Sequence, residues 1–214
     1  MNPAAVIFDM DGLLMDSERV GLHVMHACGL RQRCNIPIEM VQETVGANRQ
    51  FSSDLYRRHF PSLDTELLFR DFRENMCQLA REGKIPLKKG AKELLVELKR
   101  RGVPRAVASS SGLTTIETYL TCAGIRQDFD AVITGNGLPS KPAPDVFLRA
   151  AEALLAAPEG CLVREDSING VKAGRAAGMR VCMVPDLFPF TEELAPYCDH
   201  AVPDLAAVIP LLNP

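Results

Sequence analysis

Short apolar runs alternate along the chain with segments of helical spacing, and this alternation does most to limit the possible folds. The apolar runs lie at residues 4–9, 105–110, 130–135, 160–166, 180–185 and 200–203. Most of them lack the polar alternation of a half-exposed strand, so they predict strands that are buried on both faces of a parallel sheet. Helical patterns lie between them, at residues 91–102, 113–124, 145–157 and 168–178. This repeated order predicts a doubly wound, mostly parallel α/β sheet.

One long segment departs from this order. Residues 17–83 contain no convincing strand and carry amphipathic helical patterns, such as "ELLFRDFRENMCQLARE" at 66–82. The segment begins just after the first predicted strand and ends at "GKIPLKKG", whose glycines and proline are typical of a hinge. We therefore expect a core domain made of residues 1–16 and 84–214, with a helical domain of residues 17–83 inserted after the first strand.

Composition and charge exclude several classes of partner. The chain has 24 Lys and Arg against 27 Asp and Glu, a net charge of -3, so it has no overall basic field to attract nucleic acid or an anionic membrane. No uncharged run approaches membrane-spanning length, and the N-terminus lacks the pattern of a signal peptide. Seven cysteines without a CxxC pair favour reduced thiols. We expect a cytoplasmic protein, and nothing in the sequence demands more than a monomer.

Polar side chains follow four of the predicted strands at the point where each strand ends. In α/β sheets of this kind, ligands bind outside the carboxyl ends of the strands, so these side chains are expected to meet at one edge of the sheet. They are Asp9 and Asp11 after the first strand, Ser109 after the second, Lys141 after the third, and Glu165 and Asp166 after the fourth.

These side chains are of two chemical kinds. The clustered carboxylates repel one another, so a cation is expected among them, and oxygen-only donors favour a hard ion such as Mg²⁺. Ser109, the backbone N–H groups of Ser110 and Ser111, and Lys141 offer what a phosphate oxygen needs. Carboxylates around Mg²⁺ that face a hydroxyl–lysine anion site indicate phosphoryl transfer.

Four motifs in order carry a resemblance to a known family. "DMDG" followed by "DSE", then "VASSS", "SKPAPD" and "EDSINGVKAG", resemble the motifs of the haloacid dehalogenase superfamily, and most closely its β-phosphoglucomutase-like phosphatases. One motif alone would be weak evidence, but four at four successive strand ends are strong. The resemblance covers the whole chain, and the helical insertion is similar to the cap domain of that branch.

The resemblance implies a role for each motif residue. Asp9 would be the nucleophile that forms an aspartyl-phosphate, and Asp11 the general acid and then the general base. Asp166, the Asp9 carboxylate and the Asp11 backbone carbonyl would hold Mg²⁺, with Glu165 as a nearby or water-mediated ligand. The phosphate would be bound by Ser109, Ser110 and Lys141. In the cap, Arg49 stands where related proteins place a basic residue over the substrate.

The chain departs from the mutases of this branch at three positions. Where those enzymes carry a histidine after motif one, a cap lysine and a lysine after motif two, this chain has Gly21, Cys77 and Gly112. These losses remove cations suited to holding a bisphosphate intermediate, so they favour hydrolysis. We therefore expect an Mg²⁺-dependent phosphatase that acts on a small phosphorylated metabolite, such as a sugar phosphate.

Two alternatives remain open. One is a hexose-phosphate mutase that uses the same site. The other is a phospho-accepting signalling domain, since receiver domains also combine an acceptor aspartate, an acidic pair and a lysine. The large insertion and Asp11 argue against the second, and Asp11 also disfavours dehalogenation, because dehalogenases of the superfamily lack its equivalent. No role is predicted for Arg164, although a buried strand would prefer an apolar residue there.

Overall fold

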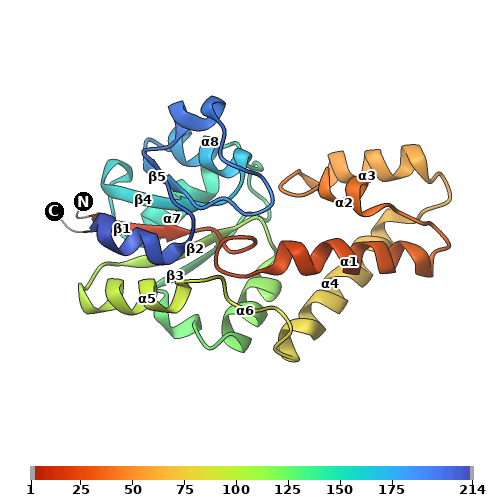
Figure 1. The fold of residues 1–214 in the computed structure, drawn as a ribbon, viewed down its shortest axis with the longest axis horizontal. Coiled ribbons are helices and arrows are strands. Elements are labelled where there is room, and N and C mark those ends of the chain that lie inside the picture. Colours follow the sequence, from red (N-terminus) through yellow and green to blue (C-terminus); the bar gives the residue numbers. More distant parts are fainter. Residues whose placement is uncertain (1–2, 213–214) are drawn as a thin grey trace.

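The computed structural model describes residues 3–212 and has a parallel sheet of six strands (Figure 1). The order across the sheet is β3-β2-β1-β4-β5-β6, and every neighbouring pair is parallel. The strands are β1 (Ala5–Phe8), β2 (Arg105–Ser109), β3 (Ala131–Thr134), β4 (Cys161–Glu165), β5 (Arg180–Met183) and β6 (His200–Ala201). This order is that of a doubly wound Rossmann-like sheet, which confirms the predicted fold class.

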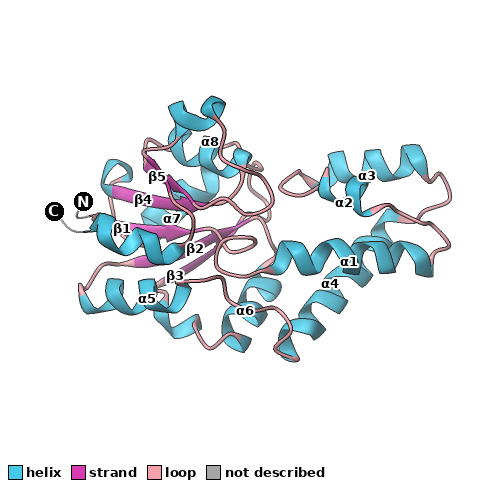
Figure 2. Ribbon diagram, in the orientation of Figure 1, coloured by secondary structure: helices cyan, strands magenta, loops and turns pink. Residues whose placement is uncertain are grey.

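Helices cover both faces of the sheet (Figure 2). One face packs against α5 (Ala91–Arg100), α6 (Leu113–Cys122) and the C-terminal 3₁₀ helix η4 (Leu205–Leu212). The other face packs against α7 (Asp145–Ala153), α8 (Ile168–Ala176) and the 3₁₀ helix η3 (Glu192–Tyr197). Two short 3₁₀ turns, η1 (Arg126–Asp128) and η2 (Pro158–Gly160), precede β3 and β4.

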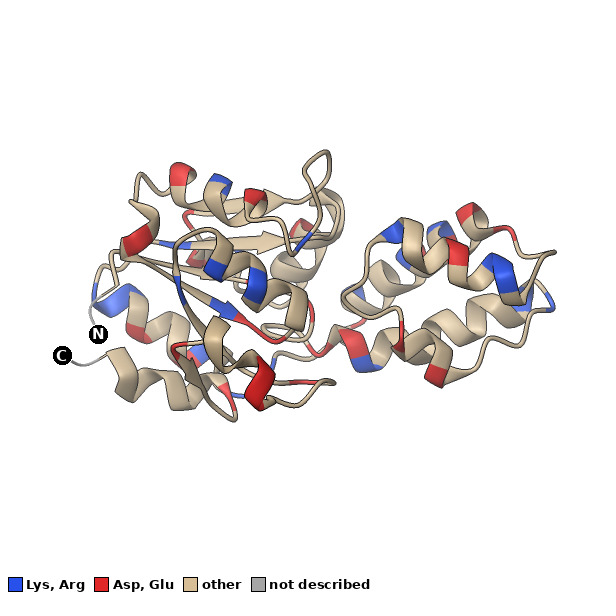
Figure 3. Cartoon of the chain, turned by 90° about the horizontal axis from the view of Figure 1, so that it is seen from above, with Lys and Arg blue, Asp and Glu red and all other residues tan. Residues whose placement is uncertain are grey.

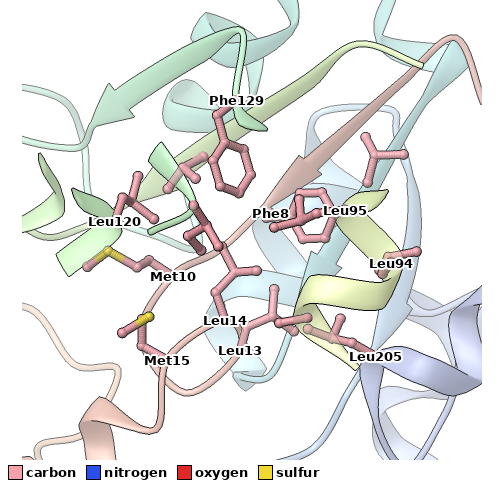
Figure 4. Packing of buried hydrophobic residues seen from close by; sticks show 14 of the residues in the cluster. Phe8, Met10, Leu13, Leu14, Met15, Leu94, Leu95, Leu120, Phe129 and Leu205 are labelled. Atoms are coloured by element: carbon pink, nitrogen blue, oxygen red, sulfur yellow. The ribbon is translucent and has the colours of Figure 1, made fainter. Parts of the chain in front are cut away.

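The central strand shows why the apolar runs lack polar alternation. Val6 and Phe8 of β1 point into the cluster beneath α5 and α6, while Ala5 and Ile7 point into the cluster beneath α7 and α8. All four are 0% exposed. Phe8 lies edge-on to Phe129, with 5.9 Å between the ring centroids (Figure 4). Both faces of the strand therefore need apolar side chains, and full burial of a Val, Ile or Phe side chain contributes about 1.5–3 kcal/mol.

Four helices occupy the segment between the first strand and the rest of the core. They are α1 (Ser17–Arg31), α2 (Ile38–Gln42), α3 (Arg49–His59) and α4 (Thr65–Arg81). Residues 17–83, all of them described, contain no strand. In Figure 1 these helices lie beyond one end of the sheet rather than on either face. We call residues 17–83 the helical segment.

The helical segment has a small core and well-defined helix starts. Buried Met25, Ile36 and Tyr56 are members of an apolar cluster of their own. The side chain of Asn48 accepts a hydrogen bond from the backbone of the first turn of α3, and Asp64 does the same for α4. Such caps satisfy backbone donors that a helix leaves unpaired, which explains where these two helices begin.

The two chain passages into and out of the helical segment run side by side. The Asp16 amide donates to the Pro86 carbonyl over 2.9 Å, and the Lys88 amide donates to the Leu14 carbonyl over 2.9 Å. Beside them the Asp186 carboxylate, whose side chain is 1% exposed, pairs with Lys88 and with Arg19 of α1, each over 2.6 Å. These contacts hold the start of the helical segment against the core.

The structure also bears on the cysteines and on possible membrane spans. All seven cysteines are unpaired thiols. Among the described residues, no helix is long and apolar enough to cross a membrane.

Candidate active site

The carboxyl ends of the central strands bring the predicted motif residues together. Asp9 follows β1, and its amide donates to the Arg164 carbonyl over 3.0 Å, which fixes it beside the end of β4. Lys141 reaches in from the loop after β3, and its ammonium pairs with Asp9 over 2.5 Å and with Glu165 over 2.7 Å. The side chains of Lys141 and Asp9 are only 8% and 9% exposed. This lysine therefore neutralises part of a buried acidic group.

Three carboxylates form the acidic side of the site. One oxygen each from Asp9, Glu165 and Asp166 lies within 4.8 Å of the others, and all three residues are buried. Burial raises the pKa of Asp9 to about 7; Lys141 opposes this shift, whereas Glu165 and Asp11 add to it. Burial and Glu165 likewise raise the pKa of Asp166 well above its usual range. The group is thus stable only with bound protons or a bound cation.

The residues present fit the Mg²⁺ ion predicted from the sequence. The donors are all oxygens, which suits a hard cation. Gly12 lies directly over them with φ +79°, and a Cβ there would lie 2.3 Å from the nearer Asp166 oxygen. A side chain at this position would collide with a potential metal ligand, so glycine keeps the cradle open. Gly12 therefore has a steric reason as well as a conformational one.

Glu165 differs from the other two carboxylates because its oxygens already have partners. One accepts from Lys141, and the other accepts from the backbone amide and the hydroxyl of Ser167 over 2.7 and 2.9 Å. Asp9 and Asp166 are therefore better placed to give an oxygen to a cation. The position of Glu165 agrees with the expectation of a nearby or water-mediated ligand, which stays a prediction.

The Asp11 carboxylate points to a group of serines instead of the acidic group. It accepts hydrogen bonds from Ser17 over 2.6 Å, from Ser111 over 2.8 Å and from Ser109 over 3.4 Å. Because the carboxylate is turned toward the serines, the predicted metal ligand of Asp11 is its backbone carbonyl and not its carboxylate. The hydroxyls fix the orientation of the carboxylate, as a residue that transfers protons requires.

The predicted phosphate ligands lie around Asp11 and Lys141. Ser109 is buried, and its hydroxyl also accepts from the Ser111 amide over 3.0 Å. Ser110 is exposed and lines the cavity described below. The structure thus brings Ser109, Ser110 and Lys141 to one place, and their contact with phosphate stays a prediction.

A cavity of about 550 Å³ lies between the strand ends and the helical segment. Its sheet side includes Asp11, Ser110 and Lys141, and its helical side includes Arg49. Arg49 is the first residue of α3; it pairs with Glu66 over 2.7 Å and lies over the Phe69 ring, 4.9 Å from its centroid. Its side chain is 49% exposed, so it could still turn toward a ligand. Substrate contact by Arg49 remains a prediction.

Glu18 is a site residue to which the sequence analysis gave no role. It lines the cavity, and one buried carboxylate oxygen has no hydrogen-bond partner among the described residues. Burial, followed by the charges of Asp11 and Asp9, raises its pKa to about 9. The available signal was the "DSE" sequence itself, in which Glu18 follows Ser17 at the start of α1.

The three positions that depart from the mutases can now be described. A Cβ on Gly21 would lie 3.4 Å from the Phe72 ring, so this aromatic ring occupies the adjacent space. Cys77 is buried in the main apolar cluster, and a Cβ on Gly112 would lie 3.3 Å from the Asn136 amide nitrogen. None of these three places presents a cation to the cavity.

Arg164 has no place in the site although it precedes the acidic pair. It is 0% exposed on β4, in register with Phe8 and Cys182 of the neighbouring strands, and its three guanidinium nitrogens find no oxygen partner in residues 3–212. Burial lowers the pKa of Arg164, and the neighbouring Cys182 thiol partly opposes that shift. The structure provides no function for it.

Comparison with known proteins agrees with the geometry. Residues 3–178 match the family model of haloacid dehalogenase-like hydrolases. Hexitol phosphatase B of Escherichia coli is 35% identical over 190 residues, covering 85% of this chain and 83% of that protein.

Two solved structures share the fold. The crystal structure of CbbY from Rhodobacter sphaeroides in complex with phosphate has a TM-score of 0.85 at 27% identity, covering 96% of each chain. A putative β-phosphoglucomutase from Thermotoga maritima has a TM-score of 0.80 at 23% identity, covering 99% of this chain and 98% of that one.

These matches confirm the predicted enzyme class, a phosphomonoester hydrolase. The chain belongs to the haloacid dehalogenase-like hydrolases.

Proposed function

We propose that this hydrolase is an Mg²⁺-dependent phosphatase that cleaves a small phosphorylated metabolite through a phosphorylated Asp9. The observation that carries the proposal is the position of Asp9. It directly follows β1, beside the Lys141 ammonium and the buried acids Glu165 and Asp166, and Asp11 lies two residues further on beside the cavity. A nucleophile, a compensating cation and a group for proton transfer are thus supplied by one sheet edge.

In the first step, a carboxylate oxygen of Asp9 bonds to phosphorus while the bond from phosphorus to the leaving oxygen breaks. Asp11 donates a proton to that oxygen, and the product alcohol leaves. The serines that bind Asp11 keep its carboxyl directed toward the cavity. Lys141 offsets the charge gathered around Asp9 and the phosphoryl group.

In the second step, a water molecule attacks the phosphorus of the aspartyl-phosphate, and Asp11 accepts the proton of that water. Inorganic phosphate is released, and the Asp9 carboxylate is restored. Asp9, Asp166 and the Asp11 carbonyl would hold Mg²⁺, with Glu165 behind them. When bound, this ion neutralises the acidic group and withdraws charge from the phosphoryl oxygens.

We further propose that the helical segment, residues 17–83, acts as a cap domain and that the enzyme works as a monomer. The Asn169 side chain at the start of α8 donates to the Gly46 carbonyl of the helical segment over 3.0 Å, so the two parts meet beside the site. A cap in this position would exclude bulk water during phosphoryl transfer.

A hexose-phosphate mutase is the alternative reaction on the same site. It would need cations to hold a second phosphate, and Gly21, Cys77 and Gly112 supply none. A signalling domain is the other alternative, but Asp11 stands where it would promote rapid loss of the phosphoryl group.

The test supplies β-glucose 1-phosphate, its bisphosphate and a panel of phosphomonoesters to purified protein, with Mg²⁺ or with a chelator. We expect phosphate release that stops on chelation and returns with Mg²⁺. Full activity after exhaustive chelation would exclude the metal. Rapid formation of glucose 6-phosphate without phosphate release would favour the mutase, and a long-lived phosphoprotein without turnover would favour signalling.

A further inference from the structure

The helical side of the cavity is largely apolar, although the sheet side is charged. Its walls come from α1, from the stretch between α2 and α3, and from α4. The apolar residues include Leu22, Met25, Val45, Phe69, Phe72 and Met76. A substrate held by its phosphate at the sheet side would direct its leaving group against these side chains.

The uncharged side chains of Thr44, Asn48 and Ser52 on this wall are already engaged within the helical segment, and the charged Glu18 and Arg73 also line it. Thr44 donates to the Val41 carbonyl over 2.7 Å and lies 2.9 Å from the Tyr56 hydroxyl. Ser52 donates to the Asn48 carbonyl over 3.2 Å, and Asn48 itself caps α3. These groups therefore offer little to the hydroxyls of a polyol, which would lose their bonds to water without replacement.

Two aromatic rings give this wall flat surfaces. Phe69 and Phe72 are three residues apart on α4, so they lie on one face of the helix. The Arg49 guanidinium lies over the Phe69 ring, and the Phe72 ring packs against Gly21 of α1 and also lines the cavity. Aromatic rings and a guanidinium plane are the groups on which a flat heterocycle stacks.

We propose that the leaving group of the substrate carries a flat, largely apolar ring, as in a nucleoside or flavin monophosphate. This inference rests on the proposed phosphatase function and goes beyond it. A cavity of about 550 Å³ is within the size range that encloses such molecules. The Arg49 charge at the rim suits the electron-rich face or carbonyl edge of a heterocycle.

The first experiment compares kcat/KM for flavin mononucleotide and uridine 5′-monophosphate with kcat/KM for sorbitol 6-phosphate and glycerol 3-phosphate. We expect at least one ring substrate to exceed both polyol phosphates by about tenfold or more. Equal or better turnover of sorbitol 6-phosphate would overturn the proposal and leave the phosphatase function standing. Failure to hydrolyse any phosphomonoester would overturn the function itself.

The second experiment changes the stacking surface. Phe72→Ala should lower kcat/KM for the preferred ring substrate about tenfold, mainly through KM. It should change kcat/KM for glycerol 3-phosphate by less than about twofold. The matched control is Phe51→Ala, because Phe51 is a helical-segment phenylalanine that is 51% exposed and does not line the cavity. An equal loss with both substrates would contradict the proposal.

Two further measurements guard against a variant that fails to fold. Phe72→Leu keeps an apolar side chain without its flat face and should show the same selective loss. Independently of turnover, the intact Asp9→Asn protein should quench flavin mononucleotide fluorescence on binding, and sorbitol 6-phosphate should compete at least about tenfold more weakly than uridine 5′-monophosphate. Stronger competition by sorbitol 6-phosphate would overturn the proposal.

Discussion

The two walls of the cavity differ in chemistry and in how the chain encodes them. The sheet wall carries Asp11 and Lys141, with the buried Asp9 beside Lys141, and these charges are paired or hydrogen-bonded at the strand ends. The helical wall presents apolar side chains such as Phe69 and Phe72. Figure 3 shows basic and acidic residues interspersed along the helices of the helical segment. The comparison suggests that one wall sets the reaction and that the other sets which molecule undergoes it.

This difference predicts separable kinetic effects. A change in the sheet wall should remove interactions with the reacting phosphoryl group and lower kcat for every substrate. A change in the helical wall should act on the leaving group, mainly through KM, and should depend on the substrate. If helical-wall variants lowered kcat equally for every substrate, the two walls would act as one unit.

The largest effect is expected at Asp9. Asp9→Asn should reduce kcat by at least about 10⁴-fold with every phosphomonoester, because an amide oxygen cannot form the aspartyl-phosphate. Asp11→Asn should cost about 10²–10⁴-fold through lost proton transfer. Steady-state phosphate release measures both.

The fold of these two variants must be checked by circular dichroism and by thermal unfolding. Replacement of Asp9 removes one of the repelling carboxylates, so the metal-free variant should be no less stable than the parent protein. Substantial turnover by a folded Asp9→Asn protein would exclude covalent catalysis at this residue.

Lys141→Met should have the next largest effect. Burial alone would lower the pKa of Lys141, but Asp9 and Glu165 raise it, so the ammonium stays charged. Its loss should lower kcat about 10²–10³-fold and destabilise the metal-free protein by about 3–5 kcal/mol, because two buried carboxylates lose their partner.

Lys141→Arg is the matched control, since it keeps the charge but changes its shape. It should retain more stability than Lys141→Met while still losing activity. If Lys141→Met unfolds at the same denaturant concentration as the parent in the absence of metal, the ion pairs do not stabilise the site.

A smaller effect concerns pH and Mg²⁺. The raised pKa of Asp9, about 7 against a usual value of 3.8, means that the folded protein holds a proton that the unfolded chain has lost between these values. Metal-free stability should therefore fall as pH rises through this window, on the order of 1.4 kcal/mol per pH unit for one group.

Magnesium replaces those protons, so it should raise Tm more at pH 8 than at pH 5. Thermal unfolding with Mg²⁺ and with a chelator at both pH values measures the difference. If Mg²⁺ raised Tm equally at the two pH values, the protons and the metal would not compete for Asp9.

The sequence predicted the sheet wall well, because each of its motif residues follows a strand and parallel strands end at one edge. The order of apolar runs and helical patterns predicted the six strands and the helical insertion. The strand ends predicted that Asp9, Lys141 and Glu165 converge. Strand ends restrict side-chain positions tightly, so a short motif is enough to indicate a place in space.

The helical wall could not be predicted by the same route. Phe69 and Phe72 have the spacing of an ordinary apolar helix face, which does not distinguish a cavity lining from a core. Their exposure depends on how α4 packs against α1 and on Gly21, a contact between residues about fifty positions apart. Glu18 was visible in its motif, but only the fold showed its unpartnered oxygen.

The smallest effect is expected behind the sheet wall, at Arg164. Its guanidinium is fully buried near the Cys182 thiol and has no oxygen partner in the described structure, so a charge is held where water cannot solvate it. Arg164→Met keeps a long, flexible side chain and removes the charge, and replacing buried ionic groups by apolar ones often gains about 1–4 kcal/mol. We therefore expect a gain of at least about 1 kcal/mol in denaturant unfolding with kcat unchanged.

Arg164→Lys serves as the control for this prediction, because it keeps a buried charge and should not be stabilised. A loss of stability in Arg164→Met would mean that the guanidinium has a partner in solution, such as a buried water. A loss of kcat with unchanged stability would instead connect Arg164 to the adjacent Glu165 and Asp166. A buried charge inside the sheet would then contribute to catalysis, and the part of the protein that sets kcat would include residues that do not line the cavity.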